Sequence, residues 1–60
     1  MIIVHSIKSG KFYIIEFNES GFIHSPVNEE FALTSKLKLV KYNDGPMIWD
    51  FRRFVLSHKP

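Results

Sequence analysis

The sequence predicts a small α+β domain, in which a short antiparallel β-hairpin or meander is followed by one or two helices. Three observations support this prediction. β-Branched and aromatic residues are concentrated in residues 1–25, turn sequences containing Gly10 and Gly21 interrupt them, and an amphipathic stretch of helical period occupies residues 46–57. The 60 residues suit one domain, so residues 1–60 are expected to form a single unit.

The first two strands are expected at about residues 1–7 and 12–17, on either side of Lys8-Ser9-Gly10-Lys11. Gly10 can take the positive φ of a two-residue hairpin turn. A loop at Ser9-Gly10 sets the register, which pairs Ile2 with Phe17, Val4 with Ile15, and Ser6 with Tyr13. These residues form an apolar core face. The opposite face is mixed, and we expect a later helix or an interface to cover it.

Asn18-Glu19-Ser20-Gly21 predicts a second turn, followed by a short third strand at about residues 22–25. This register places Ile23 opposite Phe17 on the core face. It also places His24 opposite Glu16 on the mixed face, where the two side chains would form a polar cross-strand pair.

Residues 27–35 are predicted as a helix, with Pro26 in its first turn and Glu29 and Glu30 near its start. The helix could extend to about residue 41. The alternation Lys36-Leu37-Lys38-Leu39 equally favours a further strand.

The last helix is predicted at 46–57, with Asp44 as its cap. Its core stripe contains five apolar residues, Met47, Ile48, Phe51, Phe54 and Val55. An alternative is a hairpin turn at Asn43-Asp44-Gly45, which would make the chain a small five-stranded β barrel.

Composition restricts the class of protein. The chain has no cysteine, so disulfides and thiolate metal sites are excluded. Its hydrophobic content of 45% and its nine aromatic residues argue against disorder, and a core this small favours self-association, so a homodimer is one expectation. Neither a signal peptide nor an apolar run of about 18 residues is apparent. We therefore expect a cytoplasmic protein with no membrane contact.

The sequence offers little for catalysis. It contains no glycine-rich phosphate loop, and its three histidines lack metal-ligand spacing. The best metal arrangement would bring His5 and His24 together beside Glu16 on the mixed sheet face. We expect no catalytic residue, no metal site and no cofactor, and hence no enzyme.

A protein partner is the first functional hypothesis. Trp49 and Leu56 fall outside the core stripe of the last helix, beside Arg52 and Arg53. Tryptophan and arginine are enriched at the centres of interfaces, so these four residues are the predicted partner-binding site. Short length and abundant Lys, Ile, Phe and Asn suggest an inhibitor or regulator of viral or mobile-element origin.

Nucleic-acid binding is the alternative. Residues 1–30 carry two lysines against four glutamates, a net −2, whereas residues 31–60 carry six basic against two acidic residues, a net +4. The basic half would contact phosphates through five side chains, Lys36, Lys38, Lys41, Arg52 and Arg53.

Overall fold

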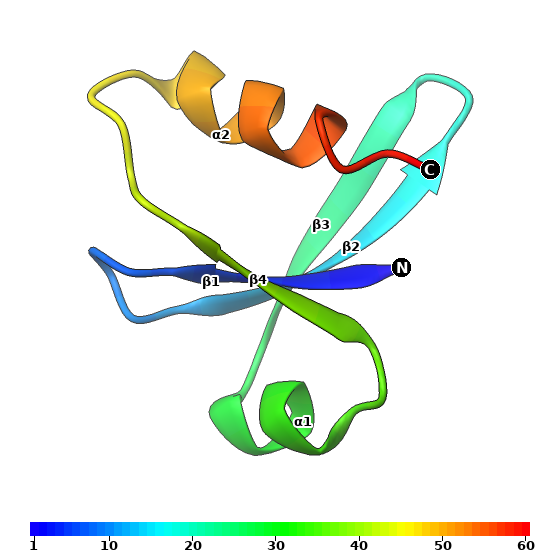
Figure 1. Ribbon diagram of the computed structural model, residues 1–60, viewed down its shortest axis with the longest axis vertical. Helices are drawn as coiled ribbons and strands as arrows, with labels where there is room; N and C mark the ends of the chain where they lie inside the picture. The colour runs from blue at the N-terminus through cyan, green and yellow to red at the C-terminus, as the bar shows by residue number, and fades with distance from the viewer.

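The computed structural model describes all 60 residues and contains four strands and two helices. In chain order they are β1 (Ile2–Ser6), β2 (Phe12–Asn18), β3 (Gly21–Val27), α1 (Glu29–Thr34), β4 (Lys38–Tyr42) and α2 (Ile48–Leu56). The strands form one open sheet in the order β3-β2-β1-β4, in which β4 runs parallel to β1 and the other pairs are antiparallel. The two helices lie on opposite faces of this sheet (Figure 1). The predicted α+β fold is confirmed, and the alternative five-stranded barrel is wrong.

The β1–β2 hairpin has a longer loop than predicted. Ile2 pairs with Ile15 and Val4 with Tyr13, a shift of two residues from the expected register. The Ser6 N–H donates to the Lys11 carbonyl (2.9 Å), and Gly10 turns the chain with a φ of +75°. Because side chains alternate with a period of two, this shift leaves the predicted faces unchanged.

The β2–β3 turn is tighter than predicted. Asn18 pairs with Gly21, which has a φ of +137°, so only residues 19–20 connect the strands. His24 consequently pairs with Ile15 instead of Glu16, and Phe22 instead of Ile23 lies opposite Phe17. The predicted third-strand register is wrong by one residue. His24 therefore lies on the face covered by α2.

The main core lies between this face and α2. Val55 is fully buried and clusters with four sheet residues, Ile2, Val4, Ile15 and Tyr42. Phe51 and Phe54 pack around the cluster, as predicted. Met47 and Ile48 are 59% and 86% exposed, so their predicted place in the core is wrong. They lie at the first turn of α2, before the helix reaches the buried cluster.

The mixed face is covered by α1, which contacts β2 and buries Ala32; Ile3 of this face is also fully buried. The helix begins after Asn28, whose side-chain oxygen accepts from the Phe31 N–H at 2.7 Å. Pro26 belongs to β3, an edge strand that tolerates a missing N–H. Of the two alternatives for residues 36–41, the further strand is confirmed and the extension of the helix is wrong, because β4 forms there against β1.

Helix α2 begins after Met47, whose N–H donates to the carboxylate of Asp50 at 3.0 Å. The prediction that Asp44 caps this helix is wrong. Its carboxylate instead accepts hydrogen bonds from Ser6 of β1 and from Lys8 in the loop after β1. Neither helix is long and apolar enough to cross a membrane.

Candidate partner-binding groove on helix α2

The four residues predicted to bind a partner line one groove of about 350 Å³, and no other residue lines it. Trp49, Arg52, Arg53 and Leu56 are spaced i, i+3, i+4 and i+7, which places them on one side of a helix. Since the stripe containing Val55 faces the sheet, this side of α2 is turned away from the core. The structure therefore brings together all four predicted residues.

Trp49 is the largest apolar side chain that lines the groove. It is the only tryptophan of the chain, and 62% of its surface is exposed. Leu56, two helical turns later, is half-buried. The groove is thus lined by an indole and an aliphatic side chain two turns apart on α2, with Arg52 and Arg53 between them along the helix.

The guanidinium of Arg52 extends toward the β2–β3 turn. A Cβ added at Gly21 would lie 3.7 Å from Arg52 Nη2, an ordinary contact distance, so the end of this side chain lies beside the turn. The one acidic residue of α2, Asp50, accepts the hydrogen bond from Met47. Arg52 and Arg53 therefore give the groove a positive charge, and no carboxylate of α2 pairs with them.

A second, larger cavity of about 450 Å³ lies between the start of α2, the end of β1 and the hairpin loop. Its polar side contains a chain of hydrogen bonds. The Ser6 hydroxyl donates to the Asp44 carboxylate at 2.7 Å, and the Ser9 hydroxyl donates to Ser6 Oγ at 2.8 Å. Sequence inspection missed this cluster, because its members come from distant parts of the chain and form no motif.

The Ser6 hydroxyl, with help from the Lys8 N–H, holds the pKa of Asp44 below its ordinary value of 3.8. These hydrogen bonds join the end of β1 and the loop after it to the segment that precedes α2. The contact therefore acts as a structural link.

The apolar side of the cavity is an aromatic cluster centred on Phe51. Its ring meets those of Tyr13, His24 and Tyr42 edge to face, with centroid distances of 5.5–5.9 Å. These contacts fix the orientation of α2 on the sheet.

His5 and His24 do not come together beside Glu16. His5 stacks on Phe12 with centroids 4.1 Å apart and lies on the α1 face, whereas His24 lies on the α2 face. No group of three or more His, Cys, Asp or Glu side chains is placed to hold a metal ion.

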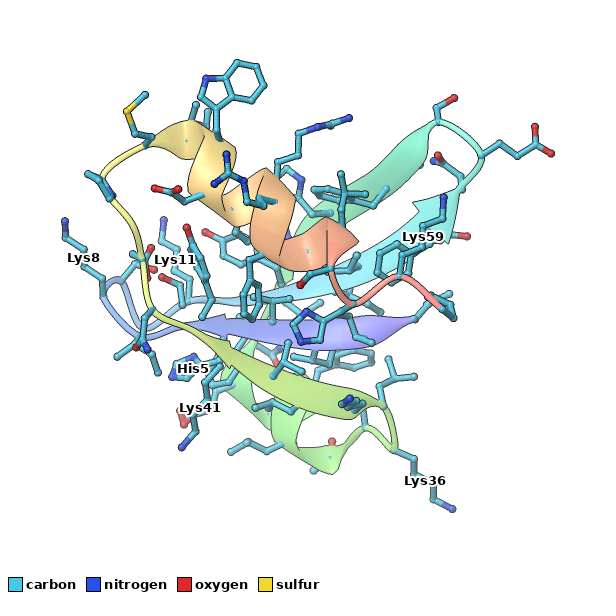
Figure 2. The ribbon with its side chains drawn as sticks, turned by 45° about the horizontal axis from the view of Figure 1, so that its top comes forward. His5, Lys8, Lys11, Lys36, Lys41 and Lys59 are labelled. Atoms are coloured by element: carbon cyan, nitrogen blue, oxygen red, sulfur yellow. The ribbon has the colours of Figure 1, made fainter.

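The five residues predicted to bind nucleic acid are not brought to one surface. Lys38 aligns with Ile2 on the α2 side of the sheet, and Lys41 aligns with His5 on the α1 side. Lys36 and Lys41 lie toward opposite ends of β4 (Figure 2), while Arg52 and Arg53 are on α2.

Comparisons of the chain with protein-family models, with curated proteins and with solved structures gave no match.

Proposed function

We propose that this protein is a small, non-enzymatic interaction module that binds another protein through the α2 groove and acts as its inhibitor or regulator. The observation that carries the proposal is the exposed Trp49 beside Arg52 and Arg53 in one groove. An exposed indole gains most from burial against a partner, since a tryptophan side chain buries roughly 150–250 Å². Its position beside two arginines matches the composition of interface centres.

The groove indicates the chemistry of the partner surface. Its two guanidinium groups would pair with carboxylates, and Trp49 and Leu56 would enclose an apolar side chain between them. We therefore propose a partner surface on which an aliphatic or aromatic residue is flanked by acidic residues.

Two further features support a binding role in the cytoplasm. The Ser6 hydroxyl donates to the Asp44 carboxylate in a contact that links β1 to the segment before α2, and this structural role is in keeping with a non-enzymatic protein. The absence of cysteine suits a reducing compartment, where disulfides do not persist.

The test compares two truncations of equally exposed apolar side chains. Trp49 and Leu33 are each 62% exposed, but Leu33 belongs to α1, on the opposite side of the sheet. Tagged wild-type protein, Trp49→Ala and Leu33→Ala are used to capture partners from a lysate, with and without nuclease. The proposal expects a captured protein that survives nuclease, is retained by Leu33→Ala and is lost with Trp49→Ala.

The two variants should also have melting temperatures within a few degrees of wild type, because both side chains are mostly outside the core. Equal capture by Trp49→Ala would refute the groove as the binding site. Recovery of nucleic acid that binds with an affinity falling steeply as salt rises would instead indicate that the partner is a nucleic acid.

A further inference from the structure

The sheet has two edges, and they differ in their capacity to accept another strand. One edge is β3, which contains Pro26 and therefore lacks one backbone N–H. The other edge is β4, which has no proline and pairs only with β1. β4 is the strand nearest the viewer in Figure 1, and no other element passes in front of it.

The outer backbone groups of β4 can be assigned from its bonds to β1. The Tyr42 carbonyl accepts from the Ile7 N–H at 3.0 Å, so Tyr42 directs its backbone groups toward β1. Backbone direction alternates along a strand. Leu39 and Lys41 therefore direct their N–H and C=O groups outward, where an added strand could pair with them.

Two cations flank this row of backbone groups. Lys38 and Lys41 are both exposed, and because they are three residues apart they project from opposite faces of the sheet. A strand added at this edge would thus meet one ammonium group on each of its faces.

A second copy of the chain fits this edge poorly. If two β4 strands paired antiparallel about Val40, Lys41 of each would lie opposite Leu39, and Lys38 opposite Tyr42. Four lysines would then lie along one short seam that holds no carboxylate, and the two Lys41 side chains would be diagonal neighbours on the same face. Charge complementarity favours a partner with carboxylates.

We propose that the outer edge of β4 binds an extended acidic segment of a partner protein, which adds as a fifth strand and places two carboxylates, three residues apart, against Lys38 and Lys41. Backbone pairing with Leu39 and Lys41 supplies affinity, and the two ion pairs supply the register and the specificity. This site is separate from the α2 groove and does not depend on it.

The probe is a capped peptide of about nine Thr and Val residues, a length sufficient for one strand. Glutamates replace its fourth and seventh residues. The control peptide has the same composition, with glutamates at the fourth and sixth positions, which lie on one face only. Binding is followed by amide chemical shifts of the isotope-labelled full chain. The proposal expects saturable shifts centred on Leu39 and Lys41, and several-fold weaker binding of the control peptide.

Two variants separate backbone pairing from charge. Lys41→Pro removes an outward N–H without breaking the ladder to β1, and it should abolish peptide binding, whereas Lys41→Ala should only weaken it. The double reversal Lys38→Glu/Lys41→Glu keeps every N–H and should favour a peptide with lysines in place of the glutamates. This second variant also tests the proposal if Lys41→Pro disturbs the fold.

Trp49→Ala should bind the peptide as wild type does, which distinguishes this edge from the α2 groove. Absence of shifts at millimolar peptide would overturn the proposal and leave the lysines as protection of the edge against self-pairing. Equal affinity for both peptides, or retained binding by a correctly folded Lys41→Pro, would overturn it as well.

Discussion

The Ser6 hydroxyl donates a 2.7 Å hydrogen bond to the carboxylate of Asp44, 38 residues further along the chain. Ser6 is the buried last residue of β1, and Asp44 lies in the segment that leads from β4 into α2. The same carboxylate accepts from the Lys8 N–H at 3.2 Å. This contact ties the start of the α2 segment to the sheet, so it bears on the position of both the helix and its groove.

The Ser6–Asp44 contact predicts a specific acid sensitivity. The folded state lowers the pKa of Asp44, so at acid pH the unfolded chain binds more protons at this position than the folded chain does. The stabilisation is complete at neutral pH and is lost as pH falls through and below about 4. Thermal unfolding of Asp44→Asn should therefore start from a lower melting temperature at pH 7 and decline less steeply than wild type toward pH 2.

The matched control is Glu19→Gln, which removes a carboxylate from the β2–β3 turn. Its melting temperature should follow the wild-type pH profile at acid pH. If Asp44→Asn and wild type declined in parallel, the carboxylate would carry no special stabilisation in the folded state.

Val55→Ala and Ile48→Ala should differ sharply, although the helical pattern alone places both residues in one stripe. Val55 is fully buried between α2 and the sheet, so its truncation should cost about 2 kcal/mol and lower the melting temperature by about 10 °C. Ile48 is 86% exposed, and its truncation should change the free energy of unfolding by less than about 0.5 kcal/mol. Similar losses in denaturant titrations of the two variants would contradict the placement of α2.

These two residues show what periodicity predicts and what it omits. The spacing of Phe51, Phe54 and Val55 correctly predicts the side of α2 that faces the sheet. The same spacing cannot indicate where along the helix the covered surface begins. Met47 and Ile48 lie at its first turn, beyond the buried cluster, and are exposed for this reason.

The strands show a similar division. Alternation along β1 and β2 correctly predicts which side chains share a face, because a shift of two residues preserves it. The length of the β2–β3 turn decides on which face His24 lies. The predicted turn was longer than the observed one, so the predicted register of β3 was wrong by one residue and placed His24 on the wrong face. The alternation of residues 36–39 gave a strand as one of two alternatives for β4, but its parallel pairing with β1 was not predictable, since that is a contact between segments distant in the chain.

The candidate groove was predictable because its four residues lie within one helix. The polar cluster of Ser6, Ser9 and Asp44 and the open edge of β4 both depend on how separate segments meet. Neither feature can be predicted from a local sequence pattern.

Gly10 should be sensitive to backbone conformation and insensitive to side-chain volume. Its φ is +75°, and a Cβ added there would meet nothing within 4 Å. Gly10→Ala should therefore cost about 1 kcal/mol through backbone strain alone, whereas Gly10→Asn should cost less, because asparagine tolerates this conformation. Denaturant unfolding measures both, and an equal loss from the two substitutions would indicate a steric cause instead.

The fluorescence of Trp49 should report on whether the α2 groove is open in the isolated protein. The indole is 62% exposed, so its emission should resemble that of a solvated indole and shift little on unfolding. Acrylamide should quench the folded and unfolded protein to similar extents at low protein concentration. If emission instead shifted to shorter wavelength and quenching fell as protein concentration rose, Trp49 would lie in a homodimer seam. The groove would then be occupied by a second copy, and partner binding through it would compete with dimerisation.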